Sequence, residues 1–475
     1  MPARPWLVAI VLSLAASSLS AADGKYNVLF IISDDLSAEA LSCYGHRECK
    51  SPNIDRLAAR GVKFTHTYCQ YPVCGPSRAA LMSSMHTSTI GVMNNGQSTN
   101  FTKNLGQRHS MSQHFRDNGY YAARVSKIYH MSIPGDITAG APGADHAASW
   151  DEAFNCKAPE WMSEGEAAVY SNEKLNKDPD KHYGLGFGTA FYAVKTSTDG
   201  TEQADHQAAD KAIELLREHK DERFFLAVGM VRPHVPLVAP AKFFGPYPAD
   251  KMTLPPKIAG DWDDIPKAGI SRNSKATGMT LDGQHETLSA YYASVAYMDY
   301  QVGRVLDELK KLGLDKNTIV VFTADHGYHL GEHDFWQKMS LHEESTHIPL
   351  IIAIPGQAPK VVNGLAGQID IYPTLAELCG LKIPDYLQGV SQVAAINSPE
   401  TSARDEILCQ TNKGKLLRTD RYAYIAYSDG SEELYDMETD PQQYTNLAKD
   451  LASQDDLIKL REQLKKQADL AKPLK

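Results

Sequence analysis

Three short apolar segments constrain the fold of this chain more than any other feature of its sequence. They are 27–33 (NVLFIIS), 224–230 (FFLAVGM) and 318–323 (TIVVFT), and polar residues follow shortly after each of them. Uninterrupted runs of this length are typical of strands buried on both faces of a parallel sheet. Because helical patterns such as 202–220 and 287–312 separate these segments, the sequence predicts an α/β fold, with helices on both faces of a large, mainly parallel or mixed sheet.

The length of the chain and the pattern near its C-terminus indicate more than one unit. The chain has 475 residues, which exceeds the roughly 250–300 residues at which a single core stops growing. From about residue 395 the pattern changes to short strands, at 419–426 and 433–435, and a charged amphipathic helix at 455–471. We therefore predict a large domain over 23–394 and a smaller C-terminal α+β subdomain over 395–475, with an antiparallel sheet and a helix.

Two segments of the large domain lack a regular pattern. Residues 131–200 are rich in Gly, Pro, Asp and Ala, and residues 240–285 are similarly irregular. Loops carry binding residues more often than the elements that they connect. We expect both segments to form loops and insertions that determine which substrate is accepted.

The N-terminus has the pattern of a secretory signal. Arg4 precedes an apolar stretch over 6–16, and small residues at 20–22 offer a cleavage site before Asp23. We expect a signal peptide over 1–22, with an uncleaved anchor as the alternative. No later segment reaches the roughly 18 apolar residues of a membrane helix. The mature protein is therefore expected to be periplasmic or secreted, without membrane contact after cleavage.

The charge of the chain limits its partners. The net charge is −10 at pH 7, which argues against a nucleic-acid or general polyanion binder. An anionic substrate must then be captured by a local basic pocket.

The chain contains seven cysteines, an odd number, at positions 43, 49, 69, 74, 156, 379 and 409. Export permits disulfides, and setting Cys74 aside leaves six thiols that could pair in an order the sequence does not give.

Possible metal ligands follow two of the three apolar segments. Asp34 and Asp35 end the first, and Asp325 and His326 follow the third. Ligands bind beyond the carboxyl ends of the strands in open α/β sheets, and adjacent carboxylates there favour a hard cation such as Ca²⁺ or Mg²⁺. A helix cap followed by an acidic residue is the alternative interpretation. His234, between two prolines after the second segment, adds a further polar residue at this edge, or is simply a rigid loop residue.

The segment from Cys74 to Arg78 (CGPSR) predicts an anion site. A thiol at a helix N-terminus lies in a positive field beside unpaired N–H groups, and Arg78 adds a fixed cation. A buried structural cysteine before a proline-started helix is the alternative. Lys127, His130 and Lys338 lie on loops between the predicted elements, where the lysines could also be solvated surface residues.

Several motifs together resemble a known family. They are NVLFIISDD, SPNIDRLA, YPVCGPSR, KIYH, FFLAVGMVRPHVP, TADHGYHLGEH and the C-terminal ELYD…DP…NLA. In this arrangement the chain is similar to the type I, formylglycine-dependent sulfatases of the alkaline-phosphatase-like superfamily, and most similar to iduronate-2-sulfatase-like enzymes. One departure is that residues 81–85 read Leu-Met-Ser-Ser-Met, where the family motif usually continues with Leu, any residue and Thr-Gly-Arg.

The resemblance implies a modified residue and a metal ion. A formylglycine-generating enzyme, or an equivalent, would convert Cys74 to formylglycine, whose hydrate is the nucleophile. One Ca²⁺ per chain would be bound by residue 74 together with Asp34, Asp35, Asp325 and His326. The His at the last of these positions is similar to the iduronate-2-sulfatase branch.

The resemblance also implies roles for the basic residues. Arg78 and Lys127 would steady the hydrate, and Lys338 and His234 would hold the sulfate. One of the latter two would protonate the leaving oxygen. His130 would take a proton from the second hydroxyl of the sulfated hydrate, which expels sulfate.

The resemblance favours a sulfated carbohydrate as substrate. A 2-O-sulfated uronate within a glycosaminoglycan or an algal polysaccharide is the expected class. Two alternatives remain at this point: a phosphate-ester or phosphonate hydrolase of the same superfamily, and a non-catalytic glycan-binding relative.

Overall fold

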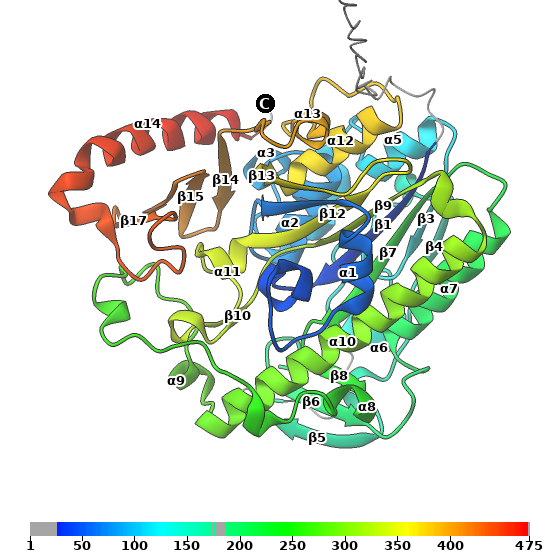
Figure 1. Ribbon diagram of the computed structural model, residues 1–475, viewed down its shortest axis with the longest axis horizontal. Helices are drawn as coiled ribbons and strands as arrows, with labels where there is room; N and C mark the ends of the chain where they lie inside the picture. The colour runs from blue at the N-terminus through cyan, green and yellow to red at the C-terminus, as the bar shows by residue number, and fades with distance from the viewer. Residues whose placement is uncertain (1–25, 173, 176–185, 474–475) are drawn as a thin grey trace, which may run out of the picture.

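A large mixed sheet forms the centre of the protein (Figure 1). The computed structural model describes residues 26–172, 174–175 and 186–473, so the expected signal peptide lies outside the described residues. The strands of the sheet are β1 (Asn27–Asp34), β2 (Val62–Tyr68), β3 (Tyr121–Val125), β4 (Glu152–Phe154), β7 (Phe224–Pro233), β9 (Thr318–Ala324), β12 (His347–Ala353) and β13 (Lys360–Gly367). Their order is β13-β2-β12-β9-β1-β7-β3-β4.

The three apolar segments are the three central strands. β1 pairs in parallel with both β7 and β9, and every residue of the three strands is buried. Ser33 lies opposite Ala324 and Asp34 lies opposite Pro233. The registers therefore bring the carboxyl ends of the three strands to one edge of the sheet.

β12 makes the sheet mixed. It runs antiparallel to β9 on one side and to β2 on the other. Its first residue, His347, consequently pairs with Tyr68 at the end of β2. An apolar run predicts a buried strand but not its direction, which explains why the sequence left the choice between parallel and mixed open.

Helices cover both faces of the sheet, as the alternating pattern predicts. On one face pack α1 (Pro52–Ala58), α7 (Ala204–Glu218) and α10 (Leu281–Lys311); on the other pack α2 (Cys74–Ser83), α5 (Met111–Asp117) and α12 (Ile371–Leu378). Along β1, Leu29 and Ile31 belong to the first core, while Val28 and Phe30 belong to the second. α10 begins at Leu281, earlier than the pattern indicated, because the Thr280 side chain caps it by accepting a hydrogen bond from the N–H of Gly283.

The segments expected to be loops contain more structure than predicted. β5 (Gly165–Val169), β6 (Tyr192–Thr196) and β8 (Leu237–Pro240) form a second sheet. β5 is exposed along its whole length, so it has no apolar run that would reveal it.

The shorter elements are α3 (Thr87–Ile90), α4 (Phe101–Leu105), α6 (Gly135–Ala139), α8 (Ala241–Phe244), α9 (Ser274–Thr277), β10 (His329–Leu330), β11 (Trp336–Gln337), α11 (Glu343–Thr346) and α13 (Val393–Asn397).

The C-terminal part forms a smaller α+β unit. Its antiparallel strands are β14 (Glu406–Gln410), β15 (Gly414–Thr419), β16 (Tyr422–Tyr427) and β17 (Glu432–Asp436), and α14 (Gln454–Leu470) lies alongside them (Figure 1). Leu457, Leu460 and Leu464 attach the helix to the sheet. The antiparallel strand predicted over 419–426 is confirmed over 422–426, which belong to β16, but its predicted start is wrong, because Thr419 ends β15 and residues 420–421 separate the two strands.

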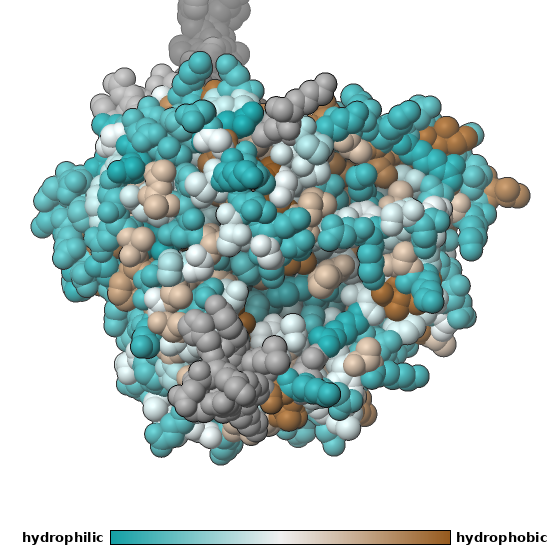
Figure 2. Space-filling view, turned by 180° about the vertical axis from the view of Figure 1, so that it is seen from behind, coloured by the Kyte–Doolittle hydropathy of each residue, from teal (hydrophilic) through white to brown (hydrophobic). Residues whose placement is uncertain are grey.

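Within the described residues, no helix is both long enough and apolar enough to span a membrane. Polar side chains dominate the face seen in Figure 2, and hydrophobic ones are scattered over it. All seven cysteines are free thiols, so the six that could have formed disulfides are not paired.

Candidate active site

The two predicted pairs of metal ligands meet at the carboxyl edge of the sheet. Asp34 ends β1 and Asp325 follows β9, and because these strands are parallel neighbours their ends coincide. The N–H of Asp35 donates to Asp325 Oδ1 at 3.2 Å, and His326 Nε2 lies 3.3 Å from Asp35 Oδ1. All four side chains are fully buried.

Cys74 is the first residue of α2, and its side chain faces this set. Its Sγ lies 3.4 Å from His326 Nε2 and 3.9 Å from Asp35 Oδ1. Gly75 permits the close packing of this turn, since a Cβ there would lie 2.2 Å from Ser98 Oγ. Burial raises the pKa of Cys74 well above its usual value, although Lys127 and Lys338 oppose the shift. The surroundings therefore keep the thiol protonated rather than producing a reactive thiolate.

Arg78 joins the ligands of the two strands. Its Nε donates to Asp325 Oδ2 at 2.9 Å, and its Nη2 donates to Asp34 Oδ1 at 3.2 Å. Its Nη1 donates to the backbone carbonyls of Lys127 and Ile128 at 2.6 and 3.1 Å. The guanidinium is fully buried, so it fixes the carboxylates and the loop after β3 in one geometry.

Two lysines compensate the remaining carboxylate charge. Lys127 Nζ donates to Asp34 Oδ2 at 2.5 Å, and Lys338 Nζ donates to both oxygens of Asp35 at 2.6 and 2.7 Å. Burial alone would raise the pKa of Asp34, but Lys127, His234 and Arg78 lower it well below its usual value. Burial would likewise raise the pKa of Asp35, but His234, Lys338 and His326 lower it below its usual value. Both carboxyl groups are therefore ionised at neutral pH.

The two histidines take different positions. His234 Nε2 lies 3.7 Å from Asp35 Oδ2, and its Nδ1–H donates to the carbonyl of Val235 at 2.5 Å. Burial lowers the pKa of His234 to about 3, against the opposing effect of Asp35. His130 forms no hydrogen bond or ion pair with Cys74 or the carboxylates within the described structure, and its buried Nδ1 has no hydrogen-bond partner. Burial, followed by Lys127, lowers its pKa well below the usual value.

The donor atoms of the site fit a divalent cation. Oxygens of Asp34, Asp35 and Asp325 lie within 4.8 Å of one another, and the same holds for donor atoms of Asp35, Cys74 and His326. Three carboxylates match the oxygen ligands that Ca²⁺ prefers, while the imidazole nitrogen is a softer ligand than usual. The residues present are therefore compatible with the calcium ion that the resemblance implies.

Two buried residues that the sequence did not single out hold the backbone of this site. Gln368 Nε2 donates to the carbonyls of Ala324 and Asp325 at 2.8 and 3.1 Å. The hydroxyl of Tyr291, on α10, donates to the carbonyl of Asp35 at 2.7 Å. Both come from distant parts of the chain, and neither lies in a motif, so no local signal could have identified them.

The predicted site residues thus gather around Cys74, with His130 at the margin of the set. Comparison with known proteins identifies the family of the chain. The sequence model of the sulfatase family, described as "Sulfatase", matches residues 26–381, and that of the C-terminal part of N-sulphoglucosamine sulphohydrolase matches residues 331–469. A sulfatase of Formosa agariphila is 32% identical over 89% of this chain and 83% of its own. The human iduronate 2-sulfatase is 30% identical over 75% of this chain and 70% of its own.

Solved structures share the fold. A phosphonate monoester hydrolase of Agrobacterium radiobacter superposes with a TM-score of 0.74 at 22% identity, covering 94% of this chain and 96% of that chain. At this identity the likeness describes the architecture alone. The sequence matches go further, because they span most of the chain, and the range of the family model contains the positions of the carboxylates and of the Cys74 segment. The chain therefore belongs to the sulfatase family and is a sulfuric ester hydrolase.

Proposed function

We propose that this enzyme hydrolyses a sulfate ester on a sulfated carbohydrate, of which a 2-O-sulfated uronate in a glycosaminoglycan or algal polysaccharide is the favoured class. The observation that carries the proposal is the position of Cys74, whose Sγ lies 3.4 Å from His326 Nε2 and 3.8 Å from Lys338 Nζ. The similarity to human iduronate 2-sulfatase supports the uronate.

The proposal includes two groups that the chain must acquire. Asp34, Asp35, Asp325 and His326 would hold one Ca²⁺, and Cys74 would be converted to formylglycine by a maturation enzyme. When present, the aldehyde hydrate supplies a nucleophilic oxygen, and the cation neutralises charge on the sulfate.

The basic residues of the chain perform the remaining tasks. Lys338 Nζ, beside both Asp35 and residue 74, is placed to donate hydrogen bonds to an anionic sulfate. Lys338 would give a proton to the leaving oxygen of the sugar, because the neutral ring of His234 directs its one N–H at the carbonyl of Val235. His234 would then help to position the sulfate. Arg78 and Lys127 would keep the carboxylates in place, because each bonds Asp34 in the interior.

His130 would act as the proton acceptor that completes turnover. Its Nδ1 is buried and has no hydrogen-bond partner, and burial with Lys127 lowers its pKa, so the imidazole is neutral. A neutral imidazole is the form that can accept a proton.

The choice between sulfate and phosphate can be tested directly. The purified enzyme should release sulfate from an aryl sulfate much faster than it releases phosphate from the matching aryl phosphate. A panel of desalted sulfated disaccharides and oligosaccharides, followed by free sulfate, should then identify the sugar and the position. Preferred turnover of the phosphate ester would contradict the proposal.

Maturation and export have their own measurements. The tryptic peptide over 64–78 should have lost the mass difference between a thiol and an aldehyde at residue 74, and an unmodified thiol in fully active enzyme would contradict the proposal. The exported protein should begin at Asp23, which N-terminal sequencing of the periplasmic or secreted fraction would check.

A further inference from the structure

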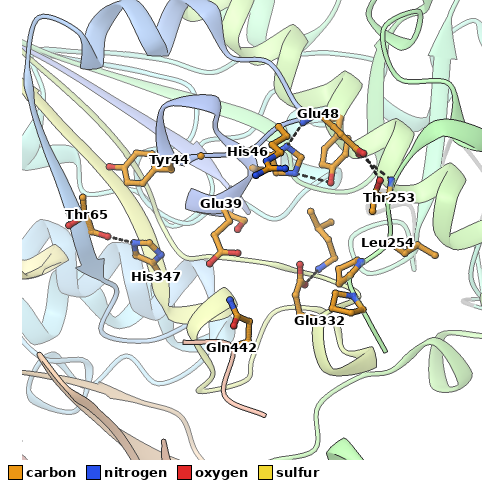
Figure 3. A pocket seen from close by; sticks show the side chains of 18 of the residues that line it. Glu39, Tyr44, His46, Glu48, Thr65, Thr253, Leu254, Glu332, His347 and Gln442 are labelled. Carbon is orange, nitrogen blue, oxygen red and sulfur yellow. Dashed lines mark hydrogen bonds between the residues drawn. The ribbon is translucent and has the colours of Figure 1, made fainter. Parts of the chain in front are cut away.

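A second cavity, of about 780 Å³, lies outside the candidate active site. It is lined by residues around the short turn Ala38–Ala40, by Tyr292 of α10 and by Leu330 of β10. Figure 3 shows Glu39 in the middle of this cavity, with His347 on one side and Glu332 on the other. Glu39 and Glu332, together with the buried residues His329 and Glu344, form what we call the acidic cluster.

An imidazole nitrogen lies between two carboxylates of the acidic cluster. His329 Nδ1 lies 3.7 Å from Glu344 Oε2 and 3.9 Å from Glu332 Oε2. The other ring nitrogen, Nε2, is 2.7 Å from Ser340 Oγ, which fixes the orientation of the ring. His329 is fully buried, Glu344 is 6% exposed, and neither Nδ1 nor Glu344 Oε2 has a hydrogen-bond partner. The structure thus leaves a buried nitrogen and a buried oxygen without the partner that such atoms require.

The negative charge of the cluster is not compensated. Among the residues that the structure describes, no lysine or arginine forms an ion pair with Glu39, Glu332 or Glu344. His329 lies within 4.0 Å of Glu332 and Glu344. The ammonium of Lys63, which also lines the cavity, donates to the carbonyl of Cys43 at 2.7 Å instead. Buried carboxylates without a cation are costly.

The titration of these groups agrees with missing positive charge. Burial, followed by Glu332 and Glu39, raises the pKa of Glu344 well above its usual value, and burial with Glu332 raises that of Glu39 to about 7. Burial, followed by His342 and His333, lowers the pKa of His329 well below its usual value, so the ring adds no positive charge. A neutral imidazole is also the form that ligates metals.

We propose that the acidic cluster binds a second divalent metal ion, of the Mn²⁺ or Zn²⁺ type, through His329 Nδ1, Glu332 and Glu344, with Glu39 closing the site from the cavity. An imidazole nitrogen combined with carboxylates suits these ions better than Ca²⁺. Within the described chain, sets of three donor atoms within 4.8 Å occur only in the active site, so the wider acidic cluster must contract around the ion. Glu39 is exposed and Glu332 is 22% exposed, which leaves both side chains room to move inward.

The position of the ion gives it a structural purpose. His329 begins β10, shortly after His326 in the same segment, and it pairs with Gln337 of β11, the residue before Lys338. An ion on His329 would therefore stabilise the segment that carries His326 and Lys338. This site is independent of the proposed substrate, because none of its ligands faces Cys74.

Metal counting tests the proposal. The mature full-length protein is dialysed against a chelator, supplied with excess Ca²⁺ to occupy the active site, and titrated separately with Mn²⁺ and Zn²⁺ by equilibrium dialysis. Wild type should bind one more equivalent of at least one of these ions than the Glu332→Gln, Glu344→Gln double variant does. The added ion should also raise the melting temperature of wild type but not of the double variant.

Two further variants keep the test decisive. Glu48→Gln alters a carboxylate at the rim of the same cavity, where it bonds Thr253, and should leave ion binding unchanged. Glu39→Gln changes only an exposed ligand, so it should fold and weaken binding by about tenfold or more. Equal binding of both ions by wild type, the double variant and Glu39→Gln would overturn the proposal. The charge of the acidic cluster would then be neutralised by protons rather than by a metal ion.

Discussion

Two carboxylates of the active site and two of the acidic cluster have pKa values that are shifted in opposite directions. In the active site Asp34 and Asp35 are joined to Arg78, Lys127 and Lys338, and their pKa values lie below the usual range. In the acidic cluster Glu39 and Glu344 have no such cation, and their pKa values are raised. Burial disfavours the charged form in both places, and the counter-charges reverse its effect at Asp34 and Asp35. At Asp325 burial outweighs His326 and Arg78, so the pKa of that carboxyl is raised.

This difference separates carboxylates that are already paired with basic side chains from carboxylates that have no such partner. The active-site carboxylates are held in fixed geometry by basic side chains before any ion binds. In the acidic cluster the N–H of Leu330 donates to Glu332 Oε2 at 2.6 Å, whereas Glu344 Oε2 has no hydrogen-bond partner. The charge of these carboxylates therefore depends on an ion or on protons for its compensation. Four predictions, taken from the largest expected effect to the smallest, test this comparison.

The largest effect is expected at Cys74, which faces the paired carboxylates. Cys74→Ala removes the residue that we propose as the precursor of the nucleophile, so turnover of an aryl sulfate should fall by a factor on the order of 10⁴ or more while oligosaccharide binding persists. Cys49→Ala, at a buried free thiol in the first core, is the matched control and should keep most activity. Unchanged turnover in Cys74→Ala would refute covalent catalysis.

The next effect concerns the stability of the paired set. Arg78→Met removes the cation shared by Asp34 and Asp325, which leaves buried charge uncompensated and should cost about 3–5 kcal/mol of unfolding free energy. Urea unfolding measures this change. Arg56→Met is the control, because its partner Asp307 is 63% exposed and the loss should stay below about 1 kcal/mol. A similar loss in both variants would show that burial of the pair does not matter.

A smaller effect of the opposite sign is expected in the acidic cluster. In the presence of a chelator at pH 8, Glu344→Gln removes one of several repelling carboxylates, so it should leave the unfolding free energy unchanged or raise it by about 1 kcal/mol. With saturating Mn²⁺ or Zn²⁺ the order should reverse, because only wild type gains the binding energy of the ion. If Glu344→Gln in chelator loses as much stability as Arg78→Met does, the carboxylates of the acidic cluster do not differ from those of the active site in the way stated here.

The smallest effect is a pH dependence from Glu39. Its pKa is about 7 in the folded protein against an ordinary value of 4.5, so the folded state binds the proton more tightly than the unfolded state. The resulting destabilisation is absent below about pH 4.5, grows as the pH rises toward 7, and is complete above 7. In metal-free protein, Glu39→Gln should therefore flatten the stability profile between these values. A profile identical to that of wild type would show that solvent in the cavity screens this group completely.

Part of the site was predictable because its residues are tied to local pattern. Asp34, Asp35, Asp325 and His326 follow buried strands directly, and parallel neighbours must end at one edge. Cys74 and Arg78 belong to one motif at one helix start. The interior position of Arg78, between two carboxylates rather than toward a substrate, follows only from the packing of α2 against the strand ends.

Other features could not be predicted, because their signals are weak or distant. β5 is exposed and β13 is only partly buried, so neither has the apolar run that reveals a strand. The strand expected over 419–426 is interrupted by a turn at residues with no Gly or Pro to mark it. Gln368 and Tyr291 support the site through hydrogen bonds to residues far away in the sequence.

The sequence by itself determined the class of fold, the strand ends and the residues that surround Cys74, since apolar runs and motifs are local properties of the chain. The tertiary structure alone decided the direction of β12, the free state of the cysteines and the existence of the acidic cluster. His329, Glu332 and Glu344 are near one another in the sequence. Glu39 is distant from them in the sequence and joins them from the turn that follows β1. Whether a buried carboxylate has a cation beside it depends on such distant contacts, which no local pattern records.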